Sequence, residues 1–223
     1  MKRSMARIAT GIAMTCALIL MSGSAAAAEP TYVGAKKCRT CHKKELIGNQ
    51  YGAWKEARHS KAFDTLLGEK AIAIAKEKGI ASPPSEAAEC LKCHATAFGL
   101  EPKDYGKKPL DLTHGVQCET CHGPGSAYRK KKVMANHEES LAKGMIVPNA
   151  ETCLGCHNDE SPSWDPAKYT LADGTQAGFD FDQAYDKIKH PIPKDVKGRY
   201  VEIEKQKKSG STETDDEEEG KED

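Results

Sequence analysis

The segment CETCHGPG, residues 118–125, decides how the rest of the chain is interpreted. Two residues separate its cysteines, a histidine follows the second one directly, and a Gly-Pro-Gly turn comes next. The same CxxCH pattern occurs at three other places in the chain. Eight of the nine cysteines therefore form four pairs, each with its own histidine: Cys38, Cys41 and His42; Cys90, Cys93 and His94; Cys118, Cys121 and His122; Cys153, Cys156 and His157.

The adjacent histidines distinguish between the chemistries that paired cysteines allow. Disulfides suit an exported chain, and CxxC pairs also occur in zinc sites and in thioredoxin-like redox centres. None of these explains a histidine after every second cysteine. A c-type haem does, because the two thiols bond covalently to the porphyrin and the neighbouring imidazole binds the iron. The pattern predicts four covalently bound haems.

Residues 1–28 have the pattern of a cleaved secretory signal peptide. Lys2, Arg3 and Arg7 precede an apolar run, and the segment ends on small residues. A membrane anchor is the weaker alternative, because the run is shorter than the roughly 20 residues that a spanning helix needs. We expect the mature chain to begin near Glu29, to lose Cys16 with the leader, and to have no transmembrane segment. Its expected location is the periplasm or the exterior of a Gram-negative bacterium.

The charges of the chain cancel overall but are unevenly distributed. The last thirteen residues, STETDDEEEGKED, carry a net charge of −7, whereas residues 29–210 carry +4. We expect a disordered acidic tail over residues 201–223 and one tetrahaem cytochrome domain over residues 29–200. With only four Phe and two Trp, the side chains alone would build a poor core, so porphyrins must fill the interior. The expected fold is mainly α with long loops, a multihaem cytochrome c wrapped around four covalently bound haems.

The mature chain also has one histidine per haem outside the motifs. Only Met134 and Met145 could provide thioether ligands instead, so the count favours two histidines on each iron and low reduction potentials. The four candidates for the second iron ligand are His59, His114, His137 and His190.

Helical patterns place two of these histidines among apolar side chains. WKEARHSKAFDTLL, residues 54–67, predicts a helix with His59 on its apolar face. KKVMANHEESLAKG, residues 131–144, predicts a second helix, which carries His137 and ends at Gly144.

A third helix is predicted in FDFDQAYDKIKHP, residues 179–191. Asp180 opens it and Pro191 stops it, with His190 in its final turn. His114 lies in a loop four residues before Cys118, and no helical pattern directs it, so an iron ligand and a bystander both remain open.

Three segments, YVGAKKCRTCH, EARHSKAF and GVQCETCHGPG, resemble the tetrahaem cytochrome c-554 family. That family is typified by the electron acceptor of hydroxylamine oxidoreductase in ammonia-oxidising bacteria. The resemblance covers most of Tyr32 to Pro193. It implies a mainly α-helical fold with haems in closely packed, partly parallel pairs.

The resemblance also implies which histidines face each other. On the family's pattern, the iron ligands would pair as His137 with His42 at the first haem, His59 with His122 at the third, and His190 with His157 at the fourth. The second haem, bound by His94, would have no outer histidine. His114 is an extra histidine relative to that pattern, which leaves open whether this iron is accessible.

The leading functional prediction is an electron carrier that passes electrons between a redox donor and a redox acceptor outside the cytoplasm. No catalytic residues are expected, since every mature cysteine is committed to haem. No nucleic acid is expected among the partners. One alternative is reduction of a small nitrogen oxide at an open His94 haem. The other is a subunit of an extracellular haem filament, because some tetrahaem relatives from metal-reducing bacteria polymerise. The basic run over residues 129–132 is either a solvated or propionate-facing surface or a docking patch.

Overall fold

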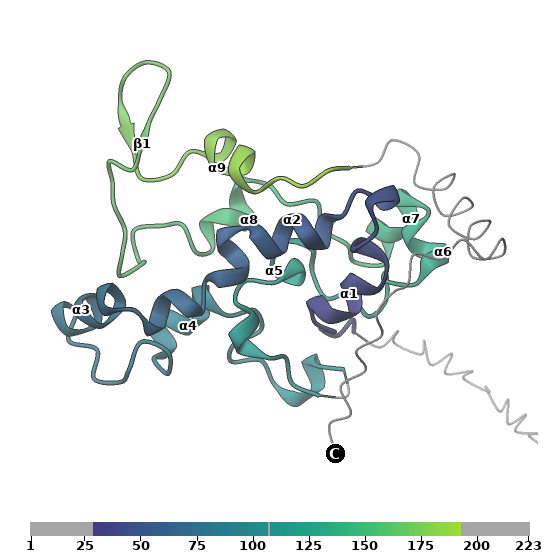
Figure 1. Cartoon of the computed structure of the whole chain (residues 1–223), viewed down its shortest axis with the longest axis horizontal. Coiled ribbons are helices and arrows are strands. Elements are labelled where there is room, and N and C mark those ends of the chain that lie inside the picture. The colour runs from purple at the N-terminus through teal and green to yellow at the C-terminus, as the bar shows by residue number, and fades with distance from the viewer. Residues whose placement is uncertain (1–28, 107, 193–223) are drawn as a thin grey trace, which may run out of the picture.

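A computed structural model describes residues 29–106 and 108–192 of the chain (Figure 1). The predicted signal peptide and acidic tail lie outside these described residues. Within them, the prediction of a mainly α fold with long loops is confirmed. The only described strands are the two of a β-hairpin, β1 (Tyr169–Thr170) and β2 (Gln176–Ala177), in which Tyr169 pairs with Ala177.

The described helices are all short. The α-helices are α1 (Ala35–His42), α2 (Gln50–Glu56), α3 (Glu69–Glu77), α4 (Ala88–His94), α5 (Cys118–His122), α6 (Lys131–Met134), α7 (His137–Ala142), α8 (Ala150–Leu154) and α9 (Phe181–Ile188). Between them lie the 3-10 turns η1 (Glu45–Ile47), η2 (Arg58–Lys61), η3 (Asp64–Leu67), η4 (Pro102–Asp104) and η5 (Leu112–His114).

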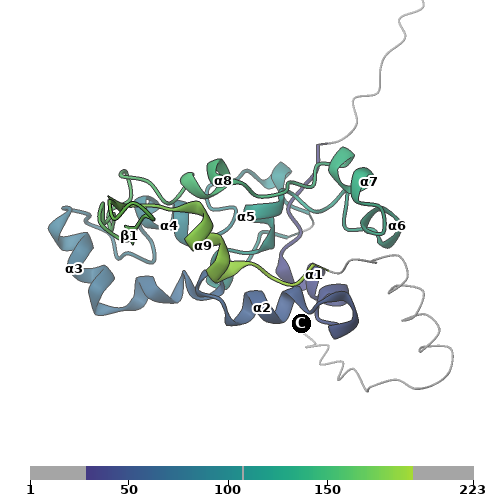
Figure 2. The same ribbon diagram turned by 90° about the horizontal axis from the view of Figure 1, so that it is seen from above.

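The elements are strung out along one long direction. Figures 1 and 2 show α3 at one end, with the β-hairpin, and α6 and α7 at the opposite end. The segment around α5 lies between these two ends and forms hydrogen bonds with residues that are distant in sequence. The backbone N–H of Gln117 donates to the Thr96 hydroxyl at 2.6 Å, and that of Thr96 donates to the Gly115 carbonyl at 3.0 Å. These bonds join the end of the second motif to the start of the third.

The helix predicted over residues 54–67 is wrong in its extent. The structure ends α2 at Glu56, places Ala57 in an extended conformation and carries His59 on the separate turn η2. The Ser60 hydroxyl lies 2.8 Å from the Lys55 carbonyl oxygen and 2.9 Å from that of Ala57, and satisfies acceptors that a continuous helix would have used. The chain therefore turns just before His59.

The helix predicted over residues 131–144 is also divided in the structure. The first part ends at Met134, and Asn136 caps the second, because its side-chain oxygen accepts the backbone N–H of Glu139 at 3.1 Å. His137 is consequently the first residue of α7 and not a mid-helix residue. The predicted stop at Gly144 agrees with a last helical residue at Ala142.

The third predicted helix is confirmed as α9. Asp180 caps it by accepting the backbone N–H of Gln183 at 2.8 Å, and the rings of Phe181 and Tyr185 stack on one side at 5.5 Å. The helix ends at Ile188, so His190 lies two residues beyond it and not in its final turn.

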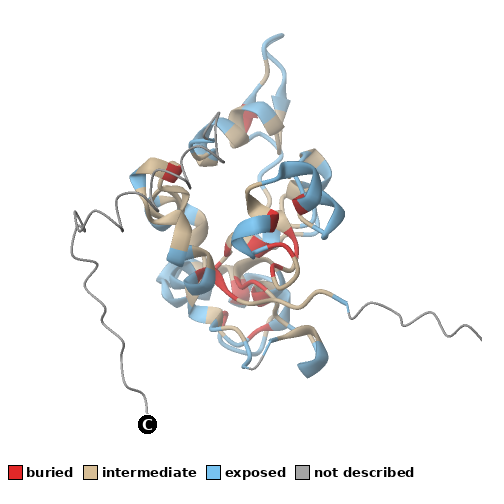
Figure 3. Cartoon of the chain, turned by 90° about the vertical axis from the view of Figure 1, so that its right-hand side faces the viewer, coloured by how far each residue is buried: buried red, intermediate tan, exposed pale blue. Residues whose placement is uncertain are grey.

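Apolar side chains form only a small core in this fold. Leu66, Leu91 and Ala95 make a cluster, against which Phe63 and Phe98 pack. Figure 3 shows that most of the ribbon is exposed or only half-buried. The buried apolar residues of the described chain are Ala35, Ile47, Leu66, Ala75, Ala87, Leu91, Ala95, Tyr128, Val133 and Tyr169. As predicted from composition, these side chains do not fill an interior by themselves.

None of the helices over residues 29–106 and 108–192 is long and apolar enough to cross a membrane.

Candidate functional site

Each CxxCH motif lies on or at the end of a short helix. The first three motifs end α1, α4 and α5, whereas the fourth begins in α8 and places Cys156 and His157 just beyond it. Residues three apart in a helix share one side, so the two thiols of a motif can bond to one porphyrin. All eight cysteines are half-buried and free of disulfide bonds.

Thiols from different motifs meet in two places. Cys38 of the first motif lies within hydrogen-bonding reach of Cys118 of the third, and Cys93 of the second is similarly close to Cys156 of the fourth. The contact lowers the pKa of Cys118 and raises that of Cys38, since one sulfur accepts the proton of the other. The structure thus brings the first motif to the third and the second motif to the fourth.

The motif histidines are oriented through their Nδ1 atoms. This atom lies 2.9 Å from Gln50 Oε1 in His42, 2.7 Å from the Ala62 carbonyl oxygen in His94, and 3.0 Å from the Ile146 carbonyl oxygen in His122. Because each partner is an acceptor, Nδ1 carries the hydrogen and Nε2 keeps a lone pair. Iron-binding histidines are commonly held in this way, so these three residues fit haem ligation.

His157 is held differently. Its ring stacks on Phe179, with centroids 5.4 Å apart and an angle of 15° between the planes. Within the described part of the chain, no hydrogen bond to its Nδ1 is found. An aromatic side chain, and not an acceptor, therefore orients the fourth motif histidine.

Two outer histidines lie opposite motif histidines. The rings of His59 and His157 have centroids 6.2 Å apart, and those of His190 and His122 are 5.9 Å apart. Two imidazoles that bind one metal ion from opposite sides, through bonds of about 2 Å, hold their ring centres roughly 6 Å apart. Burial lowers the pKa of all four, which favours the neutral form that binds iron.

These pairs differ from the arrangement that the family resemblance implied. His59 faces His157 and not His122, and His190 faces His122 and not His157. His190, near the end of the described chain, thus faces the third motif. His59, which follows the first motif in the sequence, faces the fourth.

His114 is turned toward a carboxylate. Its Nε2 atom lies 3.6 Å from Asp111 Oδ2. His114 is the last residue of the 3-10 turn η5, and Asp111 is the residue that caps this turn. In residues 29–106 and 108–192, no imidazole ring contacts that of His94. The structure does not bring His114 and His94 together.

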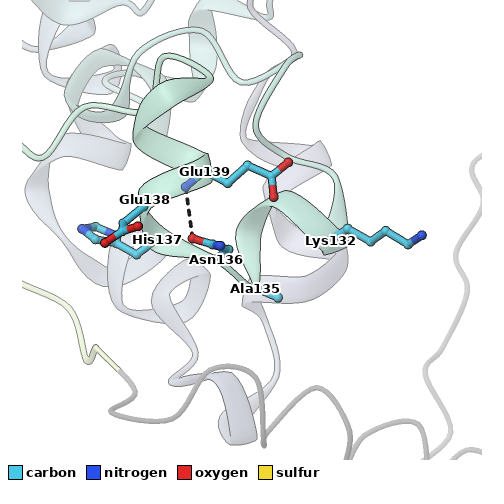
Figure 4. Close-up of a pocket in the computed structure, with 6 residues that line it drawn as sticks. All are labelled: Lys132, Ala135, Asn136, His137, Glu138 and Glu139. Atoms are coloured by element: carbon cyan, nitrogen blue, oxygen red, sulfur yellow. Dashed lines mark hydrogen bonds between the residues drawn. The ribbon is translucent and has the colours of Figure 1, made fainter.

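His137 is exposed on a surface hollow. The hollow has a volume of about 560 Å³, and Figure 4 shows His137 and Glu138 extending to one side of it and Lys132 to the other. It contains no cysteine, and the described structure places no other histidine ring against His137. A second cavity of about 230 Å³ does lie at the motifs, because Cys93 and Cys156 line it together with Phe98.

The residues that orient the motif histidines were not predicted from the sequence. These residues are Gln50, Phe179 and the carbonyl groups of Ala62 and Ile146. No local sequence pattern predicts their contacts with the histidines. The buried Glu119 was also missed, although its place between Cys118 and Cys121 was visible in the CETCH segment. The basic run over residues 129–132, in contrast, is exposed along its whole length, as expected of a solvated surface.

Comparison with known proteins finds a family model and a protein that this chain resembles. Residues 37–123, which hold the first three motifs, match the family model of cytochrome c554 and c-prime. The chain is 29% identical over 202 residues to cytochrome c-554 of Nitrosomonas europaea, an alignment that covers 82% of this chain and 83% of the relative. No solved structure gives a significant match.

The motifs, the oriented imidazoles and the two matches together define a multihaem c-type cytochrome, a protein of electron transfer. Within that class, the matches confirm the resemblance to the cytochrome c-554 family.

Proposed function

We propose that the chain binds four c-type haems and carries electrons between a redox donor and a redox acceptor outside the cytoplasm. The facing pairs His59–His157 and His122–His190 are the observation that supports this most strongly, because their spacing suits two ligands of one iron. When bound, each haem supplies a one-electron redox centre. The predicted leader supports export, and the periplasm or the cell exterior is the proposed location.

In this proposal, the residues of the chain have distinct tasks. The eight motif cysteines anchor the porphyrins, and His42, His94, His122 and His157 bind the irons from one side. His59 and His190 complete two of the irons. Gln50 and the Ala62 and Ile146 carbonyls keep the Nε2 lone pairs of three motif histidines available.

Mass spectrometry of the exported protein tests the haem count. We expect the mass of the chain from about Glu29 plus four covalently attached haems. The ferric absorption spectrum should then show low-spin iron at the sites of His157 and His122. A mass with fewer than four haems would contradict the proposal.

A second candidate function is the binding of a small molecule at the His94 haem. This is supported by the orientation of His114, which faces Asp111 and lies apart from the His94 ring. Carbon monoxide added to the reduced protein should change the absorption of the His94 haem, and of the His42 haem as well, because in the described residues no outer histidine ring lies against either motif histidine. The same change should appear in a His114→Ala variant. If the wild type does not respond and the variant does, His114 is an iron ligand and the protein is a carrier alone.

A further inference from the structure

Glu119 is a carboxylate buried between two haem-attaching cysteines. It lies inside α5, between Cys118 and Cys121, and is only 1% exposed. Its oxygens accept three backbone N–H groups: that of Val33 at 2.9 and 3.1 Å, that of Gly34 at 2.7 Å and that of Gly125 at 2.6 Å. Every partner is a donor, which matches the ionised, acceptor-only form of the group.

No cation compensates for this carboxylate in the described part of the chain. The ion pairs found there join other residues, and Glu119 has no further partner. Its hydrogen-bond partners are backbone N–H groups alone. A buried charge that is held by N–H groups and lacks a counter-ion acts on its surroundings much more strongly than a surface charge does.

The donors belong to the start of the helix that carries the first motif. Gly34 is the N-cap residue of α1 and has no side chain to accept the free N–H groups there. Glu119 accepts that of Gly34, and Gln117, which is 2% exposed, accepts that of Ala35 at 2.9 Å. The third motif therefore caps the helix of the first motif through two side chains.

This connection fixes the two attachment sites relative to each other. Cys38 and Cys118 are close enough for their thiols to hydrogen bond. The fit around the carboxylate is tight, because a Cβ atom on Gly125 would lie 3.0 Å from Glu119 Oε1. The charge of Glu119 also acts on residues that it does not bind. The burial of Tyr32 and the nearby Glu119 carboxylate together raise the pKa of Tyr32.

A haem gains positive charge when its iron is oxidised. A fixed negative charge nearby stabilises the oxidised form and lowers the reduction potential. Glu119 is adjacent in sequence to the cysteines of the third motif and hydrogen bonded to the helix of the first. The haems at the second and fourth motifs attach to other helices, α4 and α8.

We propose that Glu119 is a positioning residue that fixes the first and third haem-attachment sites relative to each other and lowers the reduction potentials of the two haems bound there. This rests on the four-haem electron carrier proposed above. It assigns a role to Glu119 and predicts that this residue lowers two of the four potentials and not the other two.

The test compares midpoint potentials from optical redox titration of the purified four-haem protein. In Glu119→Gln, two of the four potentials should rise and two should stay as in the wild type. Glu89→Gln is the matched control, because Glu89 is exposed and lies next to Cys90, so the same loss of charge should leave all four potentials unchanged. Four unchanged potentials in a folded Glu119→Gln protein would overturn the proposal.

Glu119→Asp separates charge from structure. It keeps the carboxylate but shortens its reach, so the protein should unfold at a lower temperature while its potentials stay near those of the wild type. A rise in Glu119→Asp as large as that in Glu119→Gln would show that the effect is structural. If Glu119→Gln does not fold, two raised potentials in a folded Glu119→Asp protein, which keeps the carboxylate, would still contradict an effect of charge. The haem mass of each sample is measured first, so that a missing haem, which counts against the proposed function, is distinguished from unchanged potentials.

Discussion

At the scale of single residues, the chain uses two means of orienting its motif histidines. Three of them direct an Nδ1 atom to an acceptor oxygen, and His157 instead stacks on Phe179. A hydrogen bond fixes both the direction of the ring and the position of its proton. Stacking fixes only the plane of the ring, so the fourth motif depends on an aromatic side chain for the orientation of its ligand.

Replacing Phe179 by leucine should therefore change the ligand field of one haem. We expect the electron paramagnetic resonance signal of one low-spin iron to shift, and stability to fall by about 1 kcal/mol, the usual contribution of an aromatic pair. Phe181→Leu is the control, because Phe181 makes a comparable stack with Tyr185 away from any motif histidine. It should lose similar stability and keep all its resonance signals. Identical spectra for Phe179→Leu and the wild type would count against this role.

At the scale of secondary-structure elements, the position of His59 depends on a loop and not on a helix. The His59 carbonyl accepts the backbone N–H of Val116 at 2.9 Å, from the segment that leads into α5. Gly115 approaches so closely that a Cβ atom on it would lie 2.6 Å from the His59 carbonyl oxygen. The segment that leads into the third motif thus supports the turn that presents His59 to His157.

Gly115→Ala should displace that turn. Gly115 has a φ of +66°, so alanine there meets backbone strain as well as the His59 carbonyl, and we expect a loss of roughly 3 kcal/mol or more. One haem should also become high-spin in the ferric spectrum as His59 moves away.

Gly79→Ala is the control for this prediction. Gly79 has nearly the same φ, +68°, but nothing within 4 Å of an added Cβ atom. It should cost only about 1 kcal/mol and leave the spectrum unchanged. Equal losses of stability in the two variants would mean that the contact with His59 contributes nothing.

At the scale of the whole molecule, stability should be concentrated around α5. Gln117 and Glu119 are almost fully buried there and join the third motif to the first, whereas α8 of the fourth motif has no buried residue. The apolar core is a small cluster near the second motif. Haem attachment at the third motif is thus expected to contribute more to the fold than attachment at the fourth.

Removing one haem at a time tests this order. A Cys118→Ser, Cys121→Ser variant should unfold at a much lower urea concentration than a Cys153→Ser, Cys156→Ser variant, since the first exposes the capped start of α1 and the second leaves it intact. Urea unfolding followed by far-ultraviolet circular dichroism gives the two midpoints. Equal midpoints, or the reverse order, would contradict the central role of α5.

The sequence alone determined the class of protein and its attachment chemistry. CxxCH is a local pattern, because helix geometry brings Cys118, Cys121 and His122 together without help from the rest of the chain. The shortage of large apolar side chains and the cap at Asp180 could likewise be read directly, and the structure agrees with both.

Only the tertiary structure decided which histidine faces which. His59 and His157 are 98 positions apart, and His122 and His190 are 68 apart, so no local pattern could pair them. The predicted helix through His59 was wrong because Ser60 and Val116 satisfy its backbone in another way. The capping of α1 by Glu119 was equally invisible, since hydrogen bonds between distant segments depend on how the whole chain packs and not on the residues on either side.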